Sequence, residues 1–285
     1  MREHYFNGLN KSGFHRLHYT DWGDLANPRA IICVHGLTRN CRDFDALAAA
    51  LQNDLRVISV SIAGRGKSDW LPNAEDYGYP QYMADMTALI ARITATGATD
   101  ISWLGTSMGG MLGMLLAARP GTPIKRLVLN DVGAVVPKES MARIGAYVGK
   151  DPRFDSYADI EQYVRTVSAP FGPLTDAQWQ HMTVHNTKQH DDGRWGMNYD
   201  PAIAMAFRKA VDRDIVLWDY YDAVRCPMLL LRGAQSDVLP RDTALEMTQR
   251  GARPRLVEFA GVGHAPALMA DDQIKTITDF LLANR

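Results

Sequence analysis

Ser107 lies between two glycines in the stretch LGTSMGG, residues 104–110, directly after the apolar run ISWL. Gly105 and Gly109 stand two residues away on either side, and their missing Cβ atoms permit a sharp turn from a strand into a helix. A serine at the tip of such a turn exposes its Oγ beside the first amides of the helix, as a nucleophile requires. The alternative is a helix start capped by Thr106 or Ser107, with small residues for close packing. So short a pattern does not decide between the two.

Two further residues could complete a catalytic set around this serine. A serine hydroxyl becomes a nucleophile only when a base takes its proton and a third group orients that base. His264 follows the last apolar run in GVGHAP, residues 261–266, and Asp237 follows the run MLLLR in GAQSDVLP, residues 233–240. All three residues follow predicted strands, at the sheet edge where open parallel sheets bind ligands. The order Ser107, Asp237, His264 predicts acyl-transfer chemistry; the alternative is a structural histidine and a turn aspartate.

These residues need a scaffold, and the hydrophobic pattern predicts an α/β one. Short runs rich in Val, Ile and Leu predict buried strands at residues 30–36, 55–62, 100–107, 126–133, 227–237 and 255–261. Helical patterns lie between them at residues 41–52, 81–93, 111–119, 241–250 and 271–284. Strands that alternate with helices indicate a mostly parallel sheet covered on both faces.

The alternation stops between residues 132 and 225. This segment shows no clear strand, several helical stretches, and 12 of the 25 aromatic residues of the chain. We interpret it as a helical insertion with an apolar underside, in which most aromatic residues serve ordinary packing. Trp218, Tyr220 and Tyr221, next to the return into the core, are predicted to line a substrate pocket.

With the GxSxG stretch, the residue order and the helical insertion in place, the chain resembles the α/β-hydrolase fold superfamily, in its capped serine esterase and carbon–carbon hydrolase branch. The likeness runs from about residue 15 to the end. It implies an eight-stranded, mostly parallel sheet with a helical cap inserted after strand 6. The implied domains are a core at residues 1–131 and 226–285 and a cap at residues 132–225.

The resemblance also implies roles for single residues. Ser107 is then the nucleophile, His264 the general base and acid, and Asp237 the group that orients His264. Two backbone amides hold the oxyanion: Met108, directly after the nucleophile, and Leu37, by resemblance to the family's loop after its third strand. His35 shapes that loop. Neither a metal ion nor an organic cofactor is expected.

The acid has a second candidate. Asp131 in LVLNDVG also ends a predicted strand, and some family members take their acid there. The spacing to the histidine favours Asp237, and Asp131 is expected to cap the first turn of the insertion instead.

The predicted function is a serine hydrolase that cleaves an ester or similar acyl bond of a small to medium, largely apolar substrate. Esters of 3-hydroxyacyl oligomers and ring-cleavage diketones are two substrate classes within the family. The alternatives are a carbon–carbon bond hydrolase of the meta-cleavage type and a ligand-binding homologue without catalysis.

Two other motifs compete with this interpretation. The loop SIAGRGKS, residues 61–68, misses the phosphate-binding pattern GxxxxGK[ST] by its first glycine. Nucleotide binding is disfavoured by the strand order, and Arg65 and Lys67 are expected to cap or line the mouth of the site. His181 and His185 stand one helical turn apart, a zinc-ligand spacing, but Met182 replaces the glutamate of HExxH, so a solvated cap helix is expected.

The composition of the chain limits the classes of binding partner that can be expected. A formal net charge of −1 provides no field that attracts nucleic acid or an anionic membrane, so a small-molecule substrate is expected. Cys33, Cys41 and Cys226 are odd in number and sparse, and the N-terminus shows no apolar secretory segment; both features predict a cytoplasmic location. The apolar window at residues 101–118 contains four glycines and is interpreted as a buried strand and helix. The oligomeric state is left open.

Overall fold

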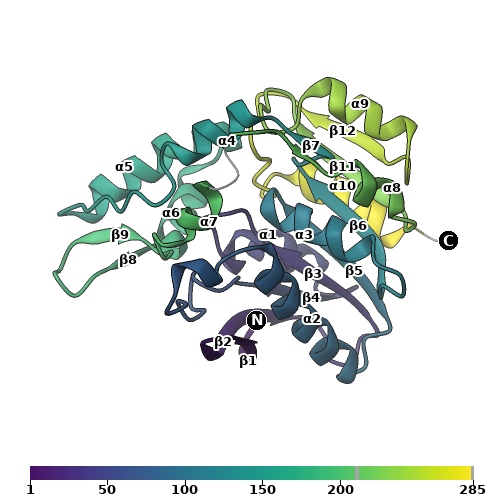
Figure 1. The fold of residues 1–285 in the computed structure, drawn as a ribbon, viewed down its shortest axis with the longest axis horizontal. Helices are drawn as coiled ribbons and strands as arrows, with labels where there is room; N and C mark the ends of the chain where they lie inside the picture. Colours follow the sequence, from purple (N-terminus) through teal and green to yellow (C-terminus); the bar gives the residue numbers. More distant parts are fainter. Residues whose placement is uncertain (209–211, 284–285) are drawn as a thin grey trace.

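The computed structural model describes residues 1–208 and 212–283. Its centre is an eight-stranded sheet in the order β1-β2-β4-β3-β5-β6-β11-β12 (Figure 1). The β1–β2 and β2–β4 pairs are antiparallel and all the others are parallel, which confirms the predicted sheet. The strands are β1 (Arg2–Asn10), β2 (Gly13–Trp22), β3 (Arg29–Val34), β4 (Arg56–Val60), β5 (Asp100–Thr106), β6 (Ile124–Asn130), β11 (Met228–Gly233) and β12 (Arg255–Phe259).

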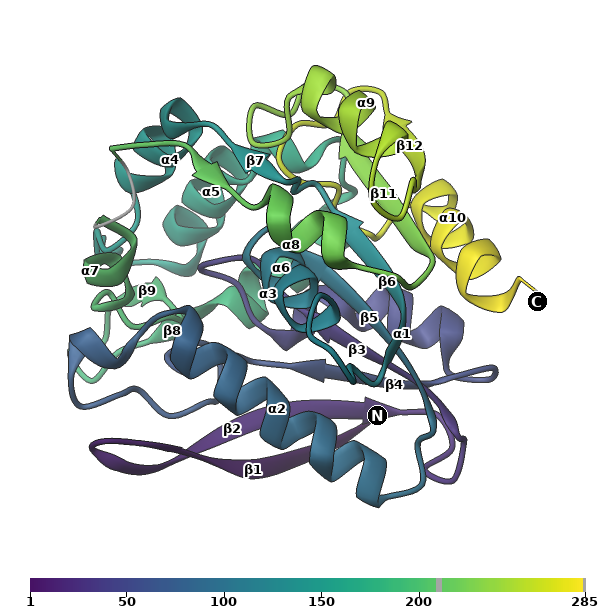
Figure 2. The same ribbon diagram turned by 45° about the vertical axis from the view of Figure 1, so that its right-hand side comes forward.

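Helices cover both faces of this sheet (Figure 2). The core helices and 3-10 turns are η1 (Cys41–Phe44), α1 (Asp45–Leu51), η2 (Ala74–Asp76), α2 (Tyr79–Ala95), α3 (Met108–Ala117), α9 (Arg241–Gln249) and α10 (Asp271–Leu282). The five predicted helices correspond to α1 with η1, α2, α3, α9 and α10. The last prediction extends to residue 284, which lies outside the described residues.

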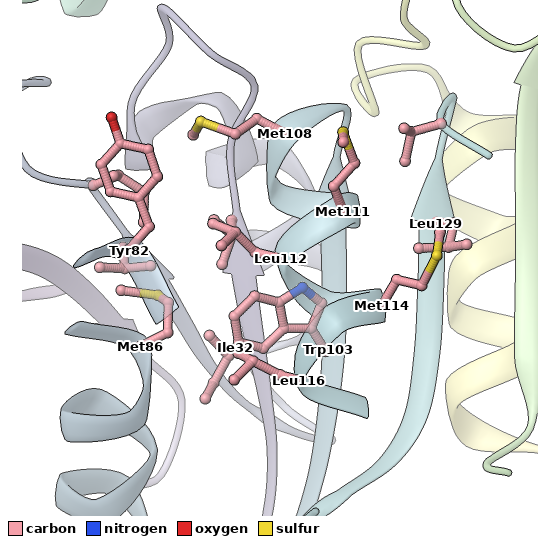
Figure 3. Close-up of a cluster of buried hydrophobic side chains, with 14 of the residues drawn as sticks. Ile32, Tyr82, Met86, Trp103, Met108, Met111, Leu112, Met114, Leu116 and Leu129 are labelled. Carbon is pink, nitrogen blue, oxygen red and sulfur yellow. The ribbon is translucent and has the colours of Figure 1, made fainter. Parts of the chain in front are cut away.

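The parallel strands inside the sheet bury both of their faces, as their near-continuous hydrophobicity predicts, whereas the edge strand β12 is partly exposed. In β3, Ile31 and Cys33 belong to the cluster that packs against α1 and α10, while Ile32 and Val34 belong to the cluster on the opposite face. Figure 3 shows Ile32 and Trp103 of the sheet packed against the apolar residues of α3. Helix α3, buried along its whole length, thereby fixes the turn that precedes it.

The chain between β6 and β11, here called the β6–β11 segment, forms a group of helices at one end of the sheet, except that its last helix, α8 (Trp218–Ala223), lies beside α3 (Figures 1 and 2). The sequence shows no clear strand here, yet the segment contains two short antiparallel pairs, β7 with β10 and β8 with β9. Each of these strands has only two or three residues, too few for an alternating pattern. The elements are β7 (Val135–Val136), α4 (Lys138–Gly145), α5 (Tyr157–Val167), η3 (Ala169–Phe171), α6 (Asp176–Asn186), β8 (Thr187–Gln189), β9 (Trp195–Met197), α7 (Ile203–Arg208), β10 (Ile215–Val216) and α8 (Trp218–Ala223).

The first two strands and the lengths of the helices complete the fold. The apolar runs do not predict β1 and β2. β1 is an edge strand whose residues are mostly exposed, and the buried residues of β2 include the polar His15, His18, Thr20 and Asp21. Across residues 1–208 and 212–283, the helices are all too short or too polar to cross a bilayer.

Candidate active site

The turn between β5 and α3 places Ser107 at its tip, as the glycine pattern predicts. Ser107 has φ 52° and ψ −115°, a left-handed backbone that a non-glycine residue rarely adopts. A Cβ on Gly105 would stand 2.1 Å from the carbonyl of Gly109, and one on Gly109 would stand 2.0 Å from the Val34 oxygen. Both glycines are therefore required by close backbone packing around the serine.

Three distant segments meet at this turn. The Ser107 Oγ lies 2.9 Å from His264 Nε2, and His264 Nδ1 lies 2.7 Å from Asp131 Oδ2. A carboxylate only accepts hydrogen bonds, so Nδ1 carries the proton and Nε2 is free to accept the one from Ser107. The arrangement matches the geometry of a nucleophile, a base and an orienting acid.

The position predicted for Asp237 is therefore occupied by Asp131. The Asp237 carboxylate receives hydrogen bonds from Arg143 Nε at 2.6 Å and Nη2 at 2.9 Å, and its side chain is 45% exposed. Burial alone raises the pKa of Asp237, but the hydrogen bonds and charge of Arg143 outweigh this and lower it. Asp237 is thus part of an ion pair, and Asp131 does not serve as the expected helix cap.

The environment of Asp131 explains why this residue, and not Asp237, bonds to His264. Its side chain is fully buried, and its carboxylate accepts hydrogen bonds from the Gly233 amide at 2.8 Å and from Ser236 Oγ at 2.6 Å. These donors, together with His264, satisfy a buried anion that would otherwise be costly. Ser236 precedes Asp237 in the chain, so the β11 loop contributes a hydroxyl to this cluster rather than its carboxylate.

Asn130, which the sequence analysis missed, joins all three segments. It is fully buried; its backbone oxygen accepts from the Ser107 amide at 3.0 Å. Its Nδ2 donates to Thr106 Oγ1 at 3.0 Å and to the Pro266 carbonyl at 2.9 Å. The only sequence sign was a polar residue at the end of an apolar strand.

The predicted oxyanion donors stand beside the serine. Leu37 and Met108 line cavities that also contain Ser107, and Met108 is the first residue of α3. Within residues 1–208 and 212–283, neither backbone amide donates a hydrogen bond to a protein acceptor. His35 lies under the loop: its Nδ1 is 2.6 Å from the Gly36 oxygen, and its Nε2 accepts from the Ile62 amide at 3.0 Å. Burial lowers the pKa of His35 to about 3, so the ring is neutral and holds the loop, as expected.

Arg65 and Lys67 do not line the mouth of the site. The Arg65 side chain is fully buried and donates to the carbonyls of Leu37 at 2.9 Å and Ala63 at 2.6 Å. Lys67 pairs with Glu3 at the surface, and Ser68 Oγ donates to the Ser61 carbonyl. These polar groups have protein partners, which argues against a phosphate-binding loop here.

Two cavities open at Ser107. The lining of the first is mixed: apolar side chains stand beside charged and aromatic ones, among them Arg39, Asp43, Arg143, Tyr147 and Phe171. The second is apolar, with Tyr79, Met111, Val136, Ile144 and Phe207 among its lining residues. The β6–β11 segment contributes to both, so it shapes the space over the serine.

Trp218, Tyr220 and Tyr221 contribute to neither cavity. Helix α8 packs against α3, and the hydroxyl of the fully buried Tyr221 donates to the Met247 carbonyl of α9. Trp218 lies under Arg250, and Tyr220 lies under Arg119. The prediction failed because α8 turns back onto the core before the chain re-enters the sheet.

The comparisons with known proteins agree with this geometry. Residues 31–275 match the model of the alpha/beta hydrolase family. A 3-hydroxybutyrate-oligomer hydrolase of Cupriavidus necator is 44% identical over 95% of this chain and 94% of its own. An esterase of Mycobacterium tuberculosis is 30% identical over 84% of this chain and 78% of its own. The crystal structure of an alpha/beta hydrolase from Novosphingobium aromaticivorans superposes with a TM-score of 0.86, at 35% identity over 98% and 97% of the two chains.

Proposed function

Since the chain belongs to the alpha/beta hydrolase family, we propose that it is a serine esterase that cleaves short 3-hydroxyacyl oligomer esters through an acyl-enzyme on Ser107. The observation that carries the proposal is the unbroken hydrogen-bond path from Ser107 through His264 to Asp131 beside two cavities. The hydrolase and esterase activities of the relatives support the same reaction class.

The chemistry proceeds in two steps in this proposal. His264 Nε2 takes the proton of Ser107 as Oγ attacks the ester carbonyl, and Asp131 holds the Nδ1 proton and stabilises the cation that forms on the ring. The amides of Leu37 and Met108 receive the developing oxyanion. His264 then protonates the leaving alcohol, and a water molecule activated by the same nitrogen releases the acid.

The two cavities favour a substrate with unlike ends. A 3-hydroxybutyrate oligomer carries methyl-bearing carbon chains, which suit the second cavity, and hydroxyl, ester and carboxylate groups, which need polar partners. The first cavity supplies such partners in Arg39 and Arg143, although each is paired with an aspartate. The name of the Cupriavidus relative supports this substrate class for the present chain.

The test uses three substrates in parallel: a linear 3-hydroxybutyrate trimer, a p-nitrophenyl butyrate reporter and a vinylogous ring-cleavage diketone. Release of 3-hydroxybutyrate, with little turnover of the diketone, is the expected result. Ser107→Ala should lower kcat on both esters by at least about 10⁴-fold, because the nucleophile is lost. The circular dichroism of this variant should match that of the native chain.

A fluorophosphonate probe supplies the control. The native protein should gain one adduct, located by mass spectrometry at Ser107, and Ser107→Ala should gain none. Turnover that survives Ser107→Ala would contradict the mechanism. Preference for the diketone would instead support a carbon–carbon hydrolase, and ligand binding without any adduct would support a non-catalytic binder.

A further inference from the structure

His181 and His185 are partly buried: one side of this histidine pair faces the core of the molecule and the other faces solvent. Both lie on α6, one turn apart, with ring centroids 4.5 Å from each other. Asp45, the first residue of α1, comes up to them from the core, and its Oδ2 lies 3.4 Å from His181 Nε2. One side-chain ligand atom from each of the three residues lies within 4.8 Å of the others.

Asp45 has bonding capacity that the protein does not use. The residue is 8% exposed, and its Oδ1 has no hydrogen-bond partner, whereas Oδ2 accepts from Arg42 Nε at 2.7 Å. A buried carboxylate oxygen without a partner costs roughly 1–3 kcal/mol. A ligand that bonds to Oδ1 would remove this cost.

The two imidazoles offer nitrogen donors of the kind that transition-metal ions bind. Both histidines are partly exposed, which leaves a path from solvent.

We propose that Asp45, His181 and His185 form a binding site for a divalent transition-metal ion, with Zn²⁺ as the best fit. Two imidazole nitrogens and a carboxylate oxygen are a zinc donor set, and water completes the tetrahedron. Ligand atoms around zinc stand roughly 3.3 Å apart, so small side-chain rotations must bring the three groups closer. None of these three residues takes part in the proposed esterase chemistry.

Arg42 is the native competitor for this site. Its guanidinium pairs with Asp45, and Asp43 and Glu3 are the other acidic groups that influence this cluster. The Arg42 side chain is 21% exposed and can turn to solvent when an ion takes its place. The Arg42 carbonyl accepts a hydrogen bond from His181 Nε2 at 3.1 Å, and this bond must break if Nε2 binds the ion.

The proposed ion joins the β6–β11 segment to the core. Helix α6 also supplies Met182 to the first cavity, and η1, directly before Asp45, supplies Asp43 and Phe44. A bound ion would therefore hold together two walls of the cavity over Ser107. Because it binds the folded chain, it should also raise the melting temperature.

The test measures metal binding by the full chain directly. Isothermal titration with Zn²⁺ at pH 7.5 should show one ion per chain, and Co²⁺ should give the strong visible absorption of a tetrahedral site. His185→Ala and Asp45→Asn should each weaken zinc binding by more than about 100-fold and abolish the thermal shift. Arg42→Gln should tighten binding about tenfold, because a competing positive charge is removed.

Two matched variants locate the ion. His190→Ala removes a histidine of the neighbouring β8–β9 hairpin, and His264→Ala removes the imidazole beside Asp131; both should bind zinc as the native chain does. Native affinity in His185→Ala, or loss of binding in His264→Ala, would overturn the proposal. If Asp45→Asn fails to fold, the partly exposed His185 still decides the question, and weaker binding in Arg42→Gln would exclude Asp45 as a ligand.

Discussion

The loops after β6 and β11 each carry an aspartate near the loop of His264, and only one of these aspartates touches the ring. Asp131 is fully buried and bonded to His264 at 2.7 Å, whereas Asp237 is nearly half exposed and bonded to Arg143. β6 and β11 are neighbours in the sheet, so both loops reach the same edge. Position at a strand end is therefore not sufficient; the carboxylate that bonds to His264 is the one that the fold buries and supplies with donors.

Removal of the Asp131 charge should have the largest effect. Asp131→Asn keeps the shape and tolerates the positive φ of 57°, but Asn can no longer hold the required His264 tautomer. We expect kcat on p-nitrophenyl butyrate to fall by about 10⁴-fold, with the substrate KM little changed. Steady-state kinetics beside a circular dichroism check measures this. A larger loss in Asp237→Asn than in Asp131→Asn would reverse the comparison.

Ser236 should have an intermediate effect, because it acts through Asp131. Ser236→Ala removes the 2.6 Å hydrogen bond to Oδ2 and should lower kcat by about tenfold. Ser236→Thr keeps a hydroxyl and should restore most of the rate. Equal kcat in the native chain and Ser236→Ala would show that the β11 loop does not support the acid.

Asp237 should have the smallest effect. Asp237→Asn should change kcat on the small reporter ester by less than about threefold and stability by at most about 1 kcal/mol, because the Arg143 pair is half exposed. The pKa of Asp237 is lower in the folded state than in the unfolded state. The ion pair therefore stabilises the folded state at pH values above the ordinary carboxyl pKa, and this stabilisation is lost as the pH falls through the folded-state pKa.

Urea unfolding of the native chain and Asp237→Asn should therefore give a small difference near pH 7 that vanishes at strongly acidic pH. A hundredfold loss of activity would return Asp237 to the acid role.

Local patterns predicted the parts of the site that local packing determines. Ser107 was predictable because close backbone contacts at Gly105 and Gly109 leave a sequence pattern. His264 was predictable because it follows the last strand of the sheet. The same logic applies to β3, β4, β5, β6 and β11, whose residues are nearly all buried and so appear as apolar runs.

The missed features depend on contacts between distant segments. Spacing along the chain favoured Asp237, but the choice of acid depends on Ser236 and Gly233, which lie more than a hundred residues from Asp131. The aromatic residues of α8 were expected at the pocket, but that helix packs on α3 and α9 instead. Likewise, the Asp45 partner of His181 is 136 residues away in the chain, so helical spacing alone indicated a solvated face.

Gly109 lies close against the Val34 carbonyl, which links the serine turn to β3; Leu37 lies in the loop that follows this strand. Ser107 and the proposed oxyanion donor Leu37 are therefore held by one frame of packed backbone, so a shift of one residue is expected to move the other. The helices between β6 and β11 also touch this frame, because α8 packs on α3 and Asn40, in the loop that contains Leu37, donates to Asn186 of α6 at 3.0 Å. Redesign of these helices for another substrate would therefore have to keep both contacts.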